Sequence, residues 1–257
     1  MINLYDISKL MWACYYYISF KVCLDIKIRG IKMSREDSLD NTLNIDTSLL
    51  MDEIKENERY FFGSTDYVTQ DIILDMLDIS ENDVFVDIGC GLGKVIYYVN
   101  HKVGCKTIGV EGDDRIFRKL KENHSGYKKK NSGKSGGNVL VHGSTGAEVN
   151  ILNRKIEDID SIYDEILKNH VFEDKDSLYF YFFNPFSVEV LKSFVAKLVE
   201  EAGMNRFGSK KIELVFYYLT PEYQMALREF PLKLEQISKL NDYYKDEFEK
   251  CCIYSLR

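Results

Sequence analysis

One stretch, Val84–Lys94, constrains the fold more than any other part of the chain. It reads Val-Phe-Val-Asp-Ile-Gly-Cys-Gly-Leu-Gly-Lys, an apolar run followed by three alternating glycines. The run predicts a buried strand over Val84–Ile88, and the apolar residues beyond it predict a helix. Because glycine has no Cβ, a turn of Gly89, Gly91 and Gly93 lets the backbone approach a ligand at that helix's N-terminus. The stretch therefore predicts a cofactor cradle of strand, glycine turn and helix.

Beyond the cradle, predicted strands and helices alternate, which is typical of a parallel sheet covered by helices on both faces. The last two predicted strands have only a loop between them and must pair antiparallel. A Lys/Gly/Ser-rich insertion over Tyr127–Gly146 is predicted to be a loop, with a small strand at Val139–His142. The other predicted strands are 106–110, 149–153, 177–183, 212–219, 232–240 and 251–256, and the helices are 113–123, 158–167, one capped by Ser187, and 221–230.

Residues 1–58 are predicted to form an N-terminal helical extension with an irregular connector, and residues 59–257 the main domain. The apolar run Leu10–Phe20 is too short to span a bilayer, and Lys21 closes it. No small-residue cleavage site follows, so we expect a packed helix rather than a signal peptide. A predicted helix with Thr65 or Asp66 as its N-cap precedes the first strand.

The charge and cysteine content narrow the classes of function. A net charge of −7 disfavours non-specific binding of nucleic acid, although it permits a local basic patch. Lys128–Lys130 with Lys134 form such a patch, which is either a solvated surface or a contact for an acidic substrate. The six cysteines form no CxxC pair and have no metal-ligand spacing with the four histidines. We therefore predict no metal and no membrane, and a reduced, cytoplasmic protein.

The spacing of the glycines separates two classes of cofactor. A dinucleotide site requires Gly-x-Gly-x-x-Gly, but the position three beyond Gly91 is Lys94. The pattern here is Asp-x-Gly-x-Gly-x-Gly over Asp87–Gly93, and Glu111 ends the second strand. This combination resembles class I S-adenosylmethionine-dependent methyltransferases. The resemblance implies a Rossmann-like α/β fold: a seven-stranded, mostly parallel sheet with one antiparallel strand and helices on both faces.

The resemblance also implies roles for individual residues. Glu111 would accept the ribose hydroxyls, and Asp87 would hold the cofactor's ammonium, directly or through water, or stabilise the turn. The turn that would surround the amino-acid end consists of Gly89, Cys90, Gly91 and Gly93. After the third strand, Lys155 stands where the family often has an acid at the adenine. Ile156 lies beside it, and Glu157 or Asp158 could substitute for that acid.

The fourth predicted strand ends in Tyr181-Phe-Phe-Asn-Pro-Phe186, where a methyl acceptor would lie. Asn184 offers a carbonyl acceptor to an amine, Pro185 stiffens the turn, and Phe186 offers an apolar wall. The motif is similar to the Asn-Pro-Pro-aromatic motif of amino-directed nucleic-acid methyltransferases. It lacks the second proline, which weakens the case for base methylation. The structural alternative is a plain strand end with a turn.

A second resemblance covers more of the chain. Gly63–Ile73, Phe85-Val-Asp-Ile-Gly89, Gly109-Val-Glu111 and the Asn-x-Phe strand end look like the non-SET histone lysine methyltransferases and their bacterial relatives. In that group the loop before the first helix covers the methionine end of the cofactor. The residues that this implies at the cofactor carboxylate are Ser64 and Thr65, with Gln70 or Tyr60 nearby. The residues that could line a lysine channel are Phe62, Phe186, and Tyr217 or Tyr218.

We therefore predict a methyltransferase that uses S-adenosylmethionine and acts on a nitrogen, in a protein lysine or a nucleic-acid amino group. The alternatives are a non-catalytic cofactor-binding partner or regulatory subunit, and a small-molecule methyltransferase. The sequence shows no obvious general base, which fits transfer driven by proximity.

Overall fold

The computed structural model describes residues 34–48, 64–132, 147–168, 176–183, 186–207, 211–240 and 242–256. Its internal contacts divide the chain into Met1–Ser38 and Leu39–Arg257. The boundary falls within α2 (Arg35–Leu43), and the elements below belong to the second unit. Most of the predicted extension over 1–58 lies outside the described residues, so that domain boundary stays a prediction. Among the residues described, no helix is long and apolar enough to cross a membrane.

A single seven-stranded sheet organises the second unit, with strand order β3-β2-β1-β4-β5-β7-β6. Its strands are β1 (Val84–Ile88), β2 (Lys106–Glu111), β3 (Val149–Asn153), β4 (Ser177–Phe183), β5 (Lys211–Tyr217), β6 (Leu232–Lys239) and β7 (Lys250–Leu256). The helices are α3 (Tyr67–Met76), α4 (Lys94–Val103), α5 (Asp114–Ser132), α6 (Ile159–Lys168), α7 (Val188–Gly203) and α8 (Pro221–Leu227).

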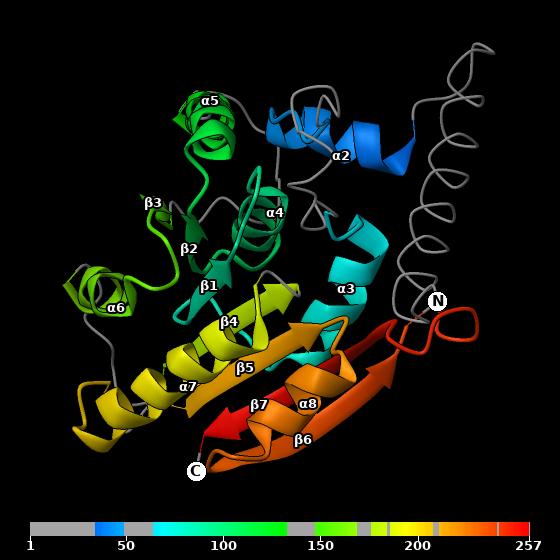
Figure 1. Cartoon of the computed structure of the whole chain (residues 1–257). Coiled ribbons are helices and arrows are strands. Elements are labelled where there is room, and N and C mark those ends of the chain that lie inside the picture. The colour runs from blue at the N-terminus through cyan, green and yellow to red at the C-terminus, as the bar shows by residue number, and fades with distance from the viewer. Residues whose placement is uncertain are drawn as a thin grey trace, which may run out of the picture. The chain divides into compact units, whose positions relative to one another are not determined.

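The strand pairing confirms the predicted architecture. β3, β2, β1, β4 and β5 pair in parallel, and β7 runs antiparallel to both β5 and β6 (Figure 1). The sheet is therefore mostly parallel with one reversed strand. The carboxyl ends of β1, β2 and β4 meet at one edge, where ligands of such sheets bind.

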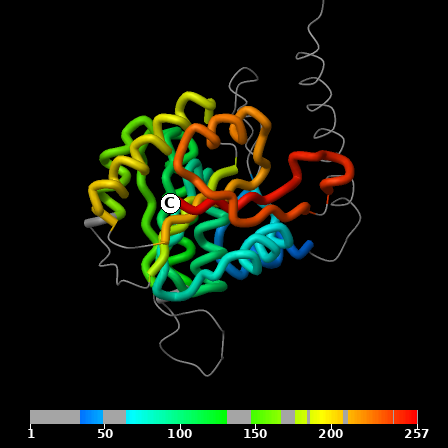
Figure 2. Tube along the Cα trace, turned by 90° about the horizontal axis from the view of Figure 1, so that it is seen from below, coloured from blue at the N-terminus to red at the C-terminus, as the bar shows by residue number. Residues whose placement is uncertain are grey.

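Side chains that alternate along the strands build two unlike faces. In β4, Phe180 and Phe182 join a large apolar cluster with α6, α7 and α8. Tyr179 and Tyr181 point the other way, where Tyr181 packs on Phe85. Figure 2 shows α7 on one side of the sheet and α3 on the other. Every residue of β1 is buried, as expected for a central strand covered on both faces.

The predicted loop over Tyr127–Gly146 is wrong in its first part, because α5 continues to Ser132. Tyr127 is buried against Tyr97, with ring centroids 4.9 Å apart, and donates a hydrogen bond to Asn100 Oδ1 at 2.7 Å. These tertiary contacts hold residues of low local helical preference in the helix. The strand predicted at Val139–His142 lies outside the described residues.

The segment before α3 packs against α5 and explains a glycine within that helix. A Cβ on Gly126 would lie 2.4 Å from the Asn44 carbonyl oxygen, so only glycine fits there. The Asn44 side chain donates to the Gly126 carbonyl at 2.7 Å. Asn123 donates to the carbonyls of Asp46 and Leu92, each at 2.9 Å, and so ties this segment to the glycine turn.

Candidate functional site

The three glycines of the turn all have left-handed backbone, with φ of 81° at Gly89, 54° at Gly91 and 85° at Gly93. A Cβ on Gly93 would lie 2.5 Å from the Tyr97 ring and 2.7 Å from Leu120, so this glycine permits α4 to pack. A Cβ on Gly91 would meet nothing within 4 Å. The open side of the turn is therefore at Gly91, where a ligand can approach the backbone.

The turn is fastened to the end of β2 by backbone hydrogen bonds. The amides of Gly89 and Cys90 both donate to the Val110 carbonyl, at 2.9 and 3.0 Å. The Cys90 side chain is buried, and a Cβ on Gly109 would lie 2.7 Å from its sulfur. The Cys90 side chain thus fills the space over Gly109 and serves packing. Only the backbone of Cys90 contributes to the turn.

Glu111 links the glycine turn to the segment that follows β2. Its Oε2 accepts the Gly91 amide at 3.0 Å, and its Oε1 accepts the Asp113 amide at 2.8 Å. The side chain is buried, and this burial raises its pKa although the backbone donors act in the opposite direction. Glu111 is therefore a fixed, partly desolvated carboxylate beside the open side of the turn.

Asp87 is the second acid of the cradle and has an unusual electrostatic state. It is 4% exposed, and burial together with the charge of Glu111 raises its pKa to about 8. Two buried carboxylates side by side favour a ligand that brings positive charge and hydrogen-bond donors. The ammonium and ribose hydroxyls of S-adenosylmethionine have this chemistry, so the residues present fit the predicted cofactor.

The loop before α3 contacts Tyr181, which lies opposite Asp87 on the neighbouring strand. The Thr65 hydroxyl is 2.7 Å from the Tyr181 hydroxyl, and Tyr181 pairs with Asp87 across β1 and β4. Gln70 donates to the Thr65 carbonyl at 2.8 Å, while its Oε1 is buried without a partner in the described part of the chain. Asp66, rather than Thr65, caps α3. Ser64 is exposed next to this loop.

Sequence reasoning missed two residues here, Tyr181 and Lys94. Tyr181 is the only described link between the Thr65 hydroxyl and β4, and nothing in an aromatic strand marks it out. Lys94 begins α4 and is only 6% exposed, with its Nζ 4.4 Å from the centroid of the Tyr67 ring. A lysine directly after the glycine turn was the signal that could have found it. The spacing analysis used Lys94 only to exclude a dinucleotide-binding site.

The loop after β3 reaches the same edge. A Cβ on Gly112 would lie 3.3 Å from both the Arg154 carbonyl oxygen and the Lys155 Cα. This loop therefore lies against the residue that follows Glu111. Ile156 is half-buried and packs on the apolar cluster, while Lys155, Glu157 and Asp158 are exposed.

The predicted acceptor motif is described only at its end. Asn184 and Pro185 lie outside the described residues. Phe186 is half-buried, stacks on Tyr223 with centroids 6.4 Å apart, and accepts a hydrogen bond from the Tyr223 hydroxyl at 2.5 Å. These contacts place Phe186 between the strand end and α8.

Aromatic rings and acids gather where β4 and β5 end, and we call them the acidic rim. The rings of Phe183 and Tyr217 lie 4.4 Å apart. The Tyr217 hydroxyl donates to Glu249 at 2.8 Å, and the Tyr218 hydroxyl donates to Asp246 at 2.6 Å. Tyr218 has φ of 62°, a strained value for a residue with a side chain. Burial and the charges of neighbouring acids raise the pKa of Glu249.

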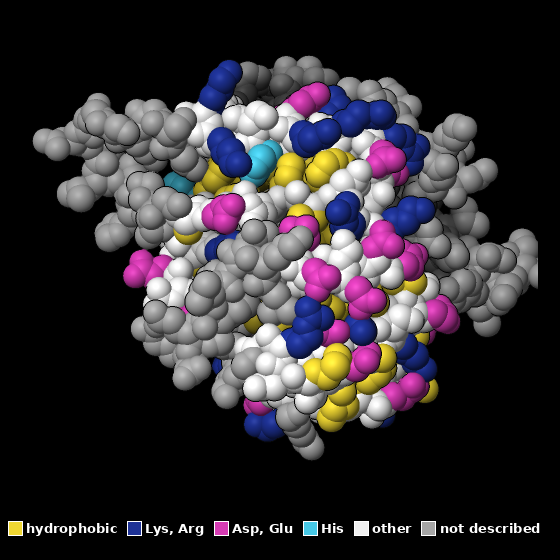
Figure 3. Space-filling model, turned by 90° about the vertical axis from the view of Figure 1, so that its left-hand side faces the viewer, with side chains coloured by type: hydrophobic (Ala, Val, Ile, Leu, Met, Phe, Trp, Pro, Cys, Tyr) yellow, Lys and Arg dark blue, Asp and Glu magenta, His cyan; other side chains and the backbone are white. Residues whose placement is uncertain are grey.

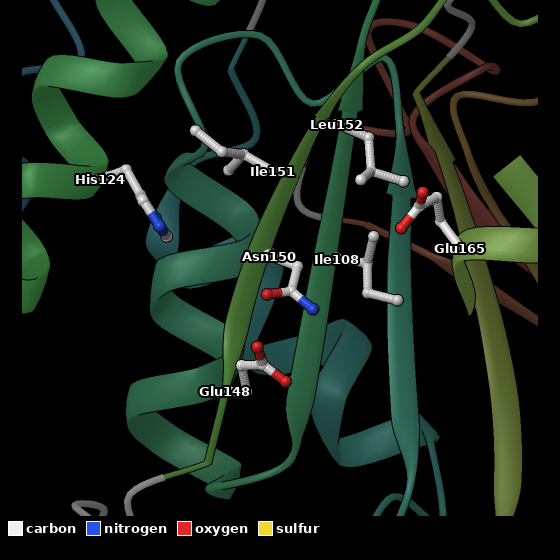
Figure 4. Close-up of a pocket in the computed structure, with 7 residues that line it drawn as sticks. All are labelled: Ile108, His124, Glu148, Asn150, Ile151, Leu152 and Glu165. Atoms are coloured by element: carbon white, nitrogen blue, oxygen red, sulfur yellow. The ribbon is translucent and has the colours of Figure 1, made fainter. Parts of the chain in front are cut away.

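A hollow of about 270 Å³ lies away from the cradle, along β3 (Figure 4). His124 reaches it from α5 and Glu165 from α6, on either side of the strand. None of the predicted site residues lines it, and its two acids, Glu148 and Glu165, come from the residue before β3 and from α6. In the described ranges no group of histidines, cysteines and acids could hold a metal.

The sheet order, the reversed β7 and the glycine turn with its acid define the class I methyltransferase fold. Within that class, residues 44–170 match the family described as "Histone methylation protein DOT1". This match confirms the resemblance to the non-SET histone lysine methyltransferase group. A stretch of 33 residues is 54% identical to "Histone-lysine N-methyltransferase, H3 lysine-79 specific" of Dictyostelium discoideum. That stretch is 13% of this chain and 2% of the Dictyostelium protein.

Solved structures with a similar fold include an RNA methyltransferase from Salinibacter ruber in complex with S-adenosyl-L-homocysteine. Its TM-score is 0.43 at 15% identity, covering 76% of this chain and 94% of that one. TrmN from Thermus thermophilus has a TM-score of 0.45 at 10% identity, covering 74% and 48% of the two chains. PH0226 from Pyrococcus horikoshii has a TM-score of 0.45 at 14% identity, covering 79% and 100%.

Proposed function

We propose that this protein transfers the methyl group of S-adenosylmethionine to a nitrogen, with a protein lysine side chain as the preferred acceptor. The observation that carries the proposal is the pair of buried carboxylates at the open side of the glycine turn. Glu111 would accept the ribose hydroxyls, and Asp87 would pair with the ammonium. The bound cofactor would supply an already activated methyl group, so the protein mainly positions the nucleophile. The acceptor would lose a proton to solvent, its neutral nitrogen would then take the methyl group, and S-adenosylhomocysteine would leave.

The amino-acid end of the cofactor carries one positive and one negative charge, and the cradle offers a match for each. Asp87 lies on the β1 side, and Lys94 stands at the N-terminus of α4, where the helix dipole also favours an anion. Ser64 and Thr65 would add hydrogen bonds to the carboxylate. Ile156 would provide an apolar contact for the adenine.

The acidic rim favours a lysine over a nucleic-acid amino group. Asp246 and Glu249 attract a protonated amine, and the rings of Phe183 and Tyr217 can hold a cation against their faces. The same acids repel the phosphates that accompany a nucleobase. In this arrangement Asn184 would accept a hydrogen bond from the amine and Phe186 would wall its path, as the strand-end motif predicts.

We also propose a cytoplasmic location. The cysteines of the described part are free and buried at positions 90, 105, 251 and 252, which suits a reducing compartment.

The test is incorporation of labelled methyl groups into cell extract, followed by digestion with protease or nuclease. We expect protease to remove the labelled macromolecule and nuclease to leave it.

Asn184→Ala should bind the cofactor normally and lose turnover. Combined Asp246→Asn and Glu249→Gln should raise KM for a lysine peptide on the order of tenfold. The matched control combines Glu229→Gln and Glu235→Gln, two exposed acids paired with Lys192 and Lys233, and so removes the same charge. Label in nucleic acid, or no label with cofactor bound, would contradict the proposal.

A further inference from the structure

Helix α5 has a charge opposite to that of the chain as a whole. It carries seven basic residues and two acids, Asp114 and Glu122, which gives a local charge of +5 in a chain of net charge −7. The basic residues are all exposed: Arg115, Arg118, Lys119, Lys121, Lys128, Lys129 and Lys130. Figure 3 shows Lys and Arg side chains gathered along the upper edge of the view, over α5. We call these seven residues the basic face.

The helix presents these charges along its whole length. At 19 residues it is about 28 Å long. Ile116, Leu120, Asn123 and Tyr127 are buried and form the stripe that packs on the domain. Five of the basic residues lie on the outward arc opposite this stripe: Arg115, Arg118, Lys121, Lys128 and Lys129. Lys119 and Lys130 lie nearer the edges of the stripe. A long ligand along the outward arc could therefore contact several basic residues at once.

Four members of the basic face have no ion-pair partner among the described residues. These are Arg118, Lys119, Lys121 and Lys128. By contrast, Arg115 is bound to Asp113 at 2.7 Å, and Lys130 donates to the Asn41 carbonyl at 2.9 Å. Uncompensated charges held along one helix produce a local positive field on a protein whose net charge is −7.

We propose that the basic face binds the phosphate backbone of double-stranded nucleic acid. Duplex DNA carries about one negative charge per 1.7 Å of its axis, which suits a row of lysines spread along a helix. Lysine acts as a point charge without a fixed geometry, which suits phosphates in any sequence. The interaction is therefore expected to be independent of sequence and strongly dependent on salt.

Two other anionic partners fit this surface less well. A membrane surface would require large apolar side chains among the basic ones, to insert between lipids. The large hydrophobic side chains that are exposed in the described part lie on α3, α8, β6 and the loops after α7 and β6, and none lies on α5. An acidic peptide would be held best by a groove, whereas these side chains stand on the convex outer arc of a helix.

The basic face starts beside the cradle, because α5 begins at Asp114 and the preceding amide is bound to Glu111. The acidic rim lies where β4 and β5 end and on the β6–β7 loop, whereas α5 packs on β2 and β3, on the other side of β1 in the sheet order. A duplex on α5 would therefore be a docking partner rather than the methyl acceptor. The inference concerns binding alone and does not rest on the proposed methyl transfer.

The test is fluorescence anisotropy of the full chain with a labelled duplex of about 20 base pairs, which is longer than α5. The variant replaces Arg118, Lys119, Lys121 and Lys128 with Gln. The matched control replaces four lysines on other elements with Gln and so removes the same charge. These are the half-buried Lys192 and the exposed Lys211, Lys233 and Lys239. Thermal unfolding and cofactor binding confirm that each variant is folded.

We expect wild type and control to bind the duplex, with an affinity that falls roughly 100-fold between about 50 and 200 mM salt if four phosphates are neutralised. The α5 variant should lose this binding and most of the salt dependence. Equal binding by the two variants, or no binding by wild type at low salt, would overturn the proposal. Binding of polyglutamate or of phosphatidylserine vesicles as tight as that of the duplex would overturn the choice of partner.

Discussion

Asp87→Asn should yield a protein that is more stable than wild type and unable to bind the cofactor well. In the folded protein the pKa of Asp87 is about 8, against 3.8 when unfolded. Because the folded state then holds a proton that the unfolded state has released, wild type loses stability as pH rises from about 4 to 8. At pH 7 the difference corresponds to about 4 kcal/mol, at about 1.36 kcal/mol per pKa unit.

Asparagine does not ionise, so the variant avoids this cost. Its amide is buried in the same place, and an imperfectly paired amide costs about 1–3 kcal/mol. The net gain at pH 7 is therefore on the order of 2 kcal/mol, which raises Tm by roughly 4–8 °C in a chain of this size. At pH 4 the two proteins should differ only by the cost of the amide, because aspartic acid is neutral in the folded state.

Cofactor binding supplies the second measurement. An ammonium beside Asp87 favours the ionised carboxylate, so binding below pH 8 should release about one proton. Calorimetry in two buffers with different ionisation enthalpies measures this proton, which Asp87→Asn should not release. The reasoning is refuted if the stability difference between variant and wild type is the same at every pH from 4 to 8.

Four further substitutions test other parts of the cradle and the rim. Gly93→Ala should destabilise the protein by about 1–3 kcal/mol in urea unfolding, since the added Cβ would collide with Tyr97. Gly91→Ala adds only backbone strain and should chiefly weaken cofactor binding. Equal losses of stability in the two variants would contradict these separate roles. Tyr218→Gly relieves the positive φ but removes a buried ring that packs on Phe248 and donates to Asp246, so it should destabilise the protein by about 2–4 kcal/mol and raise KM for a lysine substrate. Lys94→Met should weaken binding of S-adenosylhomocysteine about tenfold. Binding of methylthioadenosine, which lacks the amino-acid end, should be unchanged. An equal effect on both ligands would show that Lys94 does not bind the carboxylate.

Local patterns predicted the strands well where a continuous apolar run has sharp limits. β1, β3 and β4 begin and end at the predicted residues, because glycine, asparagine or charged residues bound each run. The reversed strand also followed from local information, since the link between β6 and β7 is too short for a crossover. These features depend on a few neighbouring residues, which is the information that a single sequence contains.

Contacts between distant segments could not be predicted in this way. The continuation of α5 depends on Tyr127 meeting Tyr97 and Asn100, and its pattern alone resembles a polar loop. The hydrogen bond of Thr65 joins residues 116 positions apart. The raised pKa of Asp87 arises from burial beside Glu111, and this coupling could not be predicted although the sequence predicted each acid separately as a cofactor residue.

The most direct test of the central claim is calorimetric titration of S-adenosylmethionine into wild type and Glu111→Gln. Glutamine keeps the shape of the side chain but loses the charge and one of the two acceptor oxygens that would bind the ribose hydroxyls. We expect one site in wild type and a loss of at least roughly tenfold in affinity in the variant, because hydrogen bonds to a charged group contribute about 1.5–3 kcal/mol. Equal affinity in the two proteins, or no binding to either, would contradict the assignment of the cradle.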